Sequence, residues 1–190
     1  MKAKKLPRIL SASERELLLS LPNPRYVTGI RNQAIIHTLL TTGLRAAELT
    51  ALRRRDIDLE TGEVRVVHGK GGRDRNIITT AKTVSAIRGW LERAPESEYV
   101  FCTAEGGQLS TSYLRQMMLR YGRRLGFDFS LHPHTLRHTY ASMLYKATKD
   151  LTVVQRLLGH ASLQSTLIYT HLVDPNGAET VEAFTGLTGL

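Results

Sequence analysis

The sequence contains one cysteine and no long apolar run, and both shortages exclude whole classes of protein. With Cys102 as its only thiol, the chain can form no internal disulfide, which fits a reducing compartment. This cysteine ends the apolar run Tyr99–Cys102, so we expect a buried, unreactive thiol rather than a nucleophile. No stretch of about 18 apolar residues is present to span a membrane. The basic N-terminus is not followed by the apolar segment of a secretion signal.

Acidic residues are scarce relative to basic ones. The 190 residues include 26 Lys and Arg against 17 Asp and Glu, which gives a net charge of +9. This excess favours a polyanion, nucleic acid above all, as the partner. The length corresponds to one large domain or two small ones. A hydrophobic content of 42% is ordinary for a globular protein.

The signatures of bound metals and nucleotides are missing as well. The acidic residues form no obvious cluster, and the pair His132 and His134 has no third ligand at a usual spacing. The glycine-rich turn at residues 69–72 lacks the spacing of a Walker-type loop. The sequence therefore predicts neither a metal site nor a cofactor site.

Hydrophobic periodicity predicts an α+β fold that is mainly helical. Ser13 and Glu16 fit a capping box at the start of the first helix. Helical spacing of apolar residues predicts helices over residues 27–40, 45–52, 83–93 and 110–125, and a helical region with short breaks to about residue 173. Alternating residues predict strands over 56–59, 63–67 and 76–79, which would form a small three-stranded antiparallel sheet.

Candidate functional residues gather in the last third of the chain. His134 and Arg137 are three residues apart, so they share one face of a predicted helix. That helix has a separate apolar stripe for the core, made of Leu136, Tyr140, Met143, Leu144 and Ala147. Gly159 suits a left-handed helix end, after which His160 would project from a loop. Tyr169 falls late in a short helix that Ser162 could cap.

Two further cations lie upstream. Arg45 follows a glycine at the start of a helix, and Glu48 could hold its guanidinium by a charge-assisted hydrogen bond. Lys70 lies in a turn between glycines, where its ammonium could enter a nucleic-acid groove. Taken singly, each of these residues is more often an ordinary surface or packing residue. Only their joint order and spacing point to a site.

That ordered set resembles the tyrosine recombinases, also called the phage integrase family. The resemblance extends over roughly residues 10–173 and is strongest in three segments, Gly43–Leu49, His134–Ser142 and Leu157–His160. It implies the integrase catalytic fold and six catalytic residues: Arg45, Lys70, His134, Arg137, His160 and Tyr169. It also implies a site-specific DNA recombinase that acts on double-stranded DNA, works in the cytoplasm at the nucleoid, and needs neither metal nor ATP.

By this resemblance, Tyr169 attacks the scissile phosphate and forms a 3′-phosphotyrosyl link. Arg45 and Arg137 would bind the non-bridging oxygens, which matches the extra negative charge of a pentacoordinate phosphorus. Cations nearby would also favour the phenolate. The covalent link conserves the phosphodiester energy, so religation needs no ATP.

The other three residues would handle protons and contacts to the phosphate. The resemblance implies that His134 assists proton transfer, that Lys70 protonates the 5′-oxygen leaving group, and that His160 hydrogen-bonds the phosphate, a position where some relatives carry tryptophan.

Family members usually carry a helical DNA-binding domain of about 80–100 residues ahead of the catalytic one. Here we expect a basic arm at residues 1–10, a catalytic domain at 11–173 and a tail at 174–190. The chain is then either the catalytic half of a longer protein or a naturally short member. Apolar residues at three-residue spacing suggest that the tail is a docking segment, although a frayed terminus is an equal alternative. The resemblance implies that this tail docks into a neighbouring subunit. The resemblance also suggests a homotetramer on DNA.

Two other functions stay open. A type IB topoisomerase uses a similar constellation to relax DNA, but the segment Leu157–His160 and the short chain favour a recombinase. A DNA-binding regulator without activity would keep the fold, but intact residues at all six positions argue against it.

Overall fold

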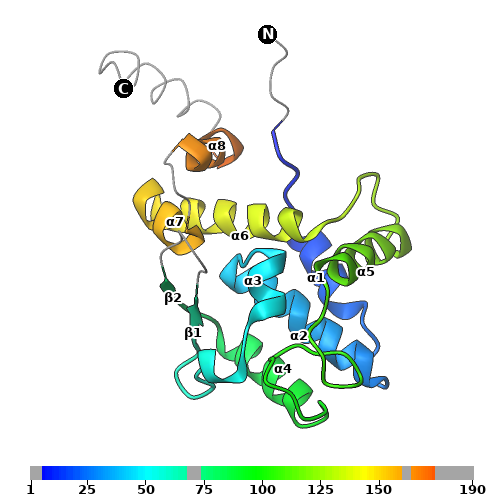
Figure 1. Cartoon of the computed structure of the whole chain (residues 1–190). Coiled ribbons are helices and arrows are strands. Elements are labelled where there is room, and N and C mark those ends of the chain that lie inside the picture. Colours follow the sequence, from blue (N-terminus) through cyan, green and yellow to red (C-terminus); the bar gives the residue numbers. More distant parts are fainter. Residues whose placement is uncertain (1–5, 68–73, 160–163, 174–190) are drawn as a thin grey trace, which may run out of the picture.

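A computed structural model shows eight α-helices and one small sheet in the parts of the chain that it describes, residues 6–67, 74–159 and 164–173 (Figure 1). The helices are α1 (Ala12–Ser20), α2 (Val27–Thr42), α3 (Ala46–Ala51), α4 (Ala81–Leu91), α5 (Thr111–Arg124), α6 (Pro133–Thr148), α7 (Leu151–Leu158) and α8 (Gln164–Val173). The strands are β1 (Glu63–Val66) and β2 (Arg75–Ile78), and a 3-10 helix at Arg54–Asp56 precedes them. The predicted mainly helical α+β fold is confirmed.

Helix α2 lies in the main core because most of its side chains are apolar or small. Ile35, Ile36 and Leu39 are fully buried, and the helix packs against α1, α4 and α6. It ends at Gly43, whose φ of 62° is the left-handed conformation that glycine adopts without strain. A Cβ atom at Gly43 would lie 2.3 Å from the Tyr140 ring, so this close approach to α6 also requires glycine. The α2 terminus is thereby held against α6.

The N-cap of the first helix lies two residues earlier than predicted. Ser11, not Ser13, is the N-cap, and it forms a capping box with Glu14. Both serines have a glutamate three residues later, so the sequence pattern alone could not separate them. The structure decides because Leu10 is buried in the core and its amide donates to the Thr139 hydroxyl on α6. The anchored chain therefore enters the helix at Ser11.

The sheet is smaller than predicted. Strands β1 and β2 pair antiparallel from Glu63 opposite Ile78 to Val66 opposite Arg75. The expected strand at residues 56–59 is reduced to one bridge between Ile57 and Val64. The Asp58 carboxylate accepts hydrogen bonds from the amides of Glu60 and Thr61, which turns the chain and ends the pairing.

Helix α6 carries a second, smaller core on its C-terminal half, separate from the main one. Ala141 packs there with Val154 and Leu158 of α7 and with Tyr169 of α8. The predicted apolar stripe of α6 is only partly right, since Leu136 is buried but Met143 is 42% exposed. Because α6 contacts α2 as well as α7 and α8, it buries a broader face that includes Arg137 and Thr139. The long α6 thus links the main core to α7 and α8 (Figure 1).

In the described residues, no helix is both long enough and apolar enough to cross a membrane. The predicted buried thiol is confirmed, because Cys102 is 0% exposed within the main core. The division into an arm, a catalytic domain and a tail stays a prediction, and the tail at residues 174–190 lies outside the described residues.

Candidate active site

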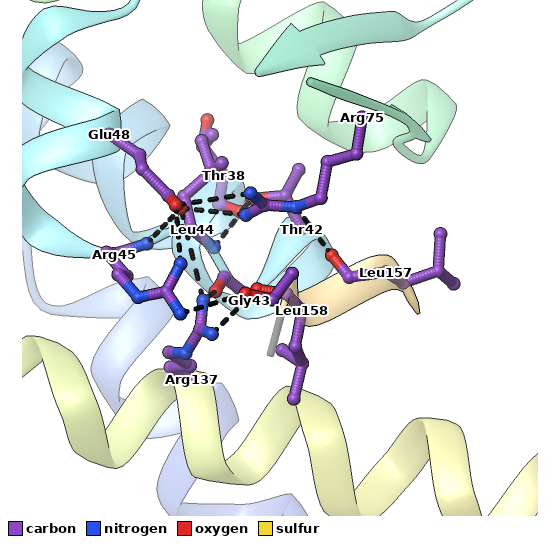
Figure 2. A network of polar contacts seen from close by, with 11 residues as sticks. Thr38, Thr42, Gly43, Leu44, Arg45, Glu48, Arg75, Arg137, Leu157 and Leu158 are labelled. Atoms are coloured by element: carbon purple, nitrogen blue, oxygen red, sulfur yellow. Dashed lines mark hydrogen bonds and ion pairs between the residues drawn. The ribbon is translucent and has the colours of Figure 1, made fainter. Parts of the chain in front are cut away.

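The centre of the site is Arg137, a buried arginine on α6. Its side chain is 6% exposed. One terminal nitrogen donates to the Gly43 carbonyl at 2.6 Å and the other to the Leu158 carbonyl at 2.8 Å (Figure 2). Both carbonyls lie at helix ends, where backbone oxygens have no partner inside the helix. The ends of α2 and α7 therefore fix the direction of this guanidinium.

Arg45 lies beside Arg137 and precedes α3 as its N-cap residue. One of its terminal nitrogens donates to Glu48 at 2.8 Å, and the other donates to the Gly159 carbonyl at 3.2 Å. The Glu48 carboxylate also accepts the Arg45 backbone amide at 2.8 Å, as predicted for a residue that holds the guanidinium. The Arg45 side chain is 38% exposed, so this guanidinium is oriented by the protein yet open to a ligand.

Glu48 joins three arginines, and one of them, Arg75, was missed in the sequence. Arg75 on β2 donates to both carboxylate oxygens of Glu48, at 3.2 and 2.8 Å, and its Nε donates to the Leu157 carbonyl at 2.8 Å (Figure 2). Arg137 lies 4.0 Å from the same carboxylate. The side chains of Glu48 and Arg75 are 7% and 6% exposed. The one signal in the sequence was alternation, since Arg75 and the buried Ile77 share a face of the strand.

Acid titration should reveal how much the Glu48 carboxylate stabilises the fold. Burial raises its pKa, but hydrogen bonds from Arg75 and Arg45 have the larger combined effect and lower the pKa from 4.5 to about 2. A carboxyl whose pKa falls on folding stabilises the protein above its unfolded pKa, and this contribution disappears as the pH falls through the folded value. We expect the Glu48→Gln substitution to lower the free energy of unfolding by about 3 kcal/mol at pH 7, because it leaves buried guanidiniums without their counter-charge.

Urea unfolding at a series of pH values from 7 to 2 measures this. The difference in unfolding free energy between Glu48→Gln and the unchanged protein should shrink as the pH falls from 5 towards about 2, near the folded pKa. Glu16→Gln, at an exposed position of α1, is the control and should cause little change. A Glu48→Gln difference that stays constant over that pH range would contradict the prediction.

Tyr169 lies on α8 with its side chain buried and its hydroxyl in a polar contact. The residue is 1% exposed, and its hydroxyl lies 3.1 Å from Nδ1 of His138, at hydrogen-bonding distance. Burial raises the pKa of this phenol, while the guanidiniums of Arg137 and Arg45 lower it. The sequence argument, that nearby positive charge favours the phenolate, is right in sign, but burial has the larger effect.

His134 stands in the first turn of α6, exposed to solvent and close to both arginines. Burial of part of the ring lowers its pKa, and the charges of Arg137 and Arg45 lower it further, with smaller effects from His132 and Arg115. Arg115 belongs to α5, so the N-terminal half of that helix borders the site. The ring of His134 meets that of His138, one turn later, edge to face with centroids 6.4 Å apart.

Four of the six predicted residues therefore gather in one place: Arg45, His134, Arg137 and Tyr169. The other two, Lys70 and His160, lie outside the described residues, although β2 and the end of α7 that flank them border the network. Sequence reasoning missed Arg75 and His138. His138 could have been found, because it lies four residues after His134 and one after Arg137. Among the described residues, no group of three or more His, Cys, Asp or Glu side chains could hold a metal ion.

Comparison with known proteins finds one matching family and a set of relatives that are named as recombinases. The profile of the Phage integrase family matches residues 1–175. The tyrosine recombinase XerC of Xanthomonas campestris pv. campestris (strain B100) is 38% identical over 171 residues, covering 89% of this chain and 52% of the relative. The tyrosine recombinase XerD of Ralstonia nicotianae is 36% identical over 177 residues, covering 88% and 57%. The chain thus spans about half the length of the curated relatives it matches.

Solved structures agree on the fold. The XerA recombinase superposes with a TM-score of 0.81 at 31% identity, covering 96% of this chain and 66% of the other. The XerH site-specific recombinase, bound to a palindromic difH substrate in a post-cleavage complex, gives a TM-score of 0.78 at 31% identity, covering 95% and 54%.

Proposed function

This chain belongs to the phage integrase family, and from that premise we propose that it acts as a site-specific DNA recombinase through a covalent 3′-phosphotyrosyl intermediate. One observation carries the proposal: a phenol on α8 lies within electrostatic reach of two oriented guanidiniums, from α6 and from the start of α3. A cationic pocket with a built-in oxygen nucleophile suits attack on a phosphodiester. The similarity to XerH, whose structure holds a cleaved difH substrate, supports the same function.

In this mechanism Arg45 and Arg137 bind the two non-bridging oxygens of the scissile phosphate. Each guanidinium has five N–H donors and uses only part of them on the protein, so others stay available to the phosphate. Since carbonyls and Glu48 already fix both groups, little reorganisation is needed when charge builds up on the phosphorus. His134, exposed beside both arginines, is placed to contact the same phosphate.

The chemical step is a transesterification. The Tyr169 hydroxyl gives up its proton to a neighbouring base as its oxygen forms a bond to phosphorus and the bond to the 5′-oxygen breaks, and the departing oxygen takes a proton from Lys70. His160 hydrogen-bonds the phosphate. Rejoining reverses the step, with a 5′-hydroxyl attacking the phosphotyrosine, so neither ATP nor a metal is required.

The proposed activity also suggests the partner, the assembly, the division of the chain and the place of action. The partner is double-stranded DNA, and two duplexes would be held by a homotetramer in which residues 174–190 dock onto a neighbour. Residues 1–10 are a basic arm and residues 11–173 the catalytic domain. A protein that recombines cellular DNA works in the cytoplasm, at the nucleoid.

Covalent capture tests the function and identifies the DNA site in the same experiment. The protein is incubated with a pool of nicked duplexes that carry a randomised core, so that cleavage releases a short fragment and traps the adduct. Detergent-resistant adducts are recovered, their DNA is sequenced, and the modified peptide is identified by mass spectrometry. We expect a defined sequence attached to Tyr169. Relaxation of supercoiled plasmid regardless of sequence would indicate a topoisomerase, and DNA binding without any adduct would indicate a regulator.

Binding to DNA should depend steeply on salt. Helix α5 exposes four arginines, Arg115, Arg120, Arg123 and Arg124, and its N-terminal half borders the site. If six or more phosphates are contacted, affinity should fall about 10³-fold or more between 50 and 200 mM salt, because counterions are released on binding. The double substitution Arg115→Gln and Arg120→Gln should reduce the slope of log affinity against log salt by about 1 to 2.

Fluorescence anisotropy with a labelled duplex measures both slopes. Lys82→Gln is a matched control, since this exposed lysine lies on α4, far from α6 in Figure 1. A flat salt response, or an equal effect of the control, would place DNA binding elsewhere.

A further inference from the structure

The histidine that touches the proposed nucleophile is not one of the six residues singled out in the sequence. Nδ1 of His138 lies 3.1 Å from the Tyr169 hydroxyl, and the two rings are tilted by 50° with centroids 5.9 Å apart. His134, Arg137 and His138 follow one another on the same side of α6, at positions i, i+3 and i+4. One helix face thus presents a histidine to solvent, a guanidinium to the pocket and a histidine to the phenol.

The direction of this hydrogen bond follows from the chemistry of the two groups. A phenol is the stronger donor and a neutral imidazole nitrogen the stronger acceptor, so the Tyr169 hydroxyl donates to Nδ1 and the imidazole proton resides on Nε2. Burial, together with the charges of the neighbouring His134 and Arg137, lowers the pKa of His138 to about 4. The imidazole is therefore neutral near pH 7 and keeps its acceptor nitrogen on the phenol.

The surroundings leave His138 well placed to receive the phenolic proton. Tyr169 is 1% exposed, so bulk water has little access to it. His138 stays neutral because its ring is largely buried and because His134 and Arg137 lie close to it. A phosphodiester bound at Arg45 and Arg137 would bring negative charge close to the His138 ring. An anion at that position favours the imidazolium, so the basicity of His138 would rise when substrate arrives.

We propose that His138 is a further catalytic residue, the general base for Tyr169. As the Tyr169 oxygen forms its bond to phosphorus, the phenolic proton passes to Nδ1 of His138, and the bond to the 5′-oxygen breaks with protonation of that oxygen by the general acid. On religation the proton returns from His138 to the phenol. This assignment rests on the proposed function. It gives the two histidines different roles: His134 contacts the phosphate, and His138 accepts the proton of the nucleophile Tyr169.

Single-turnover cleavage of the captured nicked duplex tests the proposal. We expect His138→Phe, which keeps a ring but removes the acceptor, to slow adduct formation by roughly 10²-fold while DNA affinity stays unchanged. His138→Asn retains an acceptor that is not a base, so it should also be slow, by about 10-fold or more. The Asn variant keeps the test valid if Phe disturbs the packing of α8. His37→Asn, on α2 beside Lys82 and not in contact with the phenol, is the control and should react normally.

Two chemical probes separate a general base from a packing role. Incorporation of 3-fluorotyrosine at position 169 makes the phenol more acidic. It should therefore reduce the factor by which each His138 variant slows adduct formation. A duplex with sulfur in place of the bridging 5′-oxygen needs no proton on its leaving group, and it should not rescue them. The proposal would be overturned if the sulfur duplex restored the rate of adduct formation in the His138 variants, or if fluorotyrosine left their loss of rate unchanged. Normal rates of adduct formation in both variants would overturn it as well. If the wild-type protein formed no adduct at all, the proposed function would be overturned as well.

Discussion

Tyr169→Phe should abolish the covalent adduct on a nicked duplex. The substitution deletes the only atom of the side chain that can attack phosphorus, and the ring still fills its place in the cluster of α6, α7 and α8. Loss of the hydrogen bond to His138 should cost only about 1 kcal/mol of stability, so the variant should fold and bind DNA. We expect adduct formation to fall by at least about 10⁴-fold, to the limit of detection, since no covalent intermediate can form.

Tyr145→Phe is a suitable control for this experiment. Tyr145 belongs to α6 and packs at the edge of the same cluster, so it tests the loss of a hydroxyl from that region without removing the proposed nucleophile. Gel separation after denaturation in detergent measures the adduct for both variants. Adduct formation by Tyr169→Phe at the level of the control would move the nucleophile to another residue and refute the mechanism.

Arg137→Lys should nearly stop cleavage while it preserves the charge. Arg137 is oriented by the carbonyls of Gly43 and Leu158 and retains further donors for a phosphate. A lysine has a single ammonium group, which cannot satisfy two carbonyls and also bind a phosphate in the same fork geometry. Removing one preorganised donor from a charged transition state typically costs about 10²–10³-fold in rate, and we expect a loss of that size or greater.

Duplex binding should change little in this variant, because one phosphate contact among several is affected. Rapid-quench measurement of the adduct, together with anisotropy and thermal unfolding, separates catalysis from binding and stability. Arg93→Lys on the surface after α4 is the matched control. Cleavage by Arg137→Lys within a few-fold of the control would show that the buried guanidinium has no direct role at the phosphate.

The same network connects the hairpin to the catalytic arginines. Arg75 joins β2 to Glu48 and to the end of α7, while Glu48 holds Arg45. A Cβ atom at Gly159 would lie 2.9 Å from the Arg75 guanidinium, so glycine is needed there for space as well as for its left-handed backbone. The helix end that precedes His160 and the strand that follows Lys70 are thereby tied to one carboxylate.

The amino-acid sequence alone predicted the helices, the left-handed helix end at Gly159, and the list of candidate residues. These features depend on local physics: helical periodicity, the conformational freedom of glycine, and motif spacing along the chain. It also predicted the pairing of Arg45 with Glu48, because residues three apart at a helix start are neighbours. Local patterns were weakest where two of them competed, as at Ser11 and Ser13, or where one side chain ended a strand, as at Asp58.

Only the tertiary structure decided which partners these residues find across the chain. Arg137 reaches carbonyls 94 positions upstream and 21 downstream, and Arg75 reaches Leu157 over a separation of 82. Such contacts depend on how α2, α6 and α7 pack, and no short-range pattern records them. The same holds for Tyr169, whose burial and contact with His138 arise from the docking of α8 on α6. Electrostatic interactions act through space, so the pKa of each group is determined by neighbours that folding brings close.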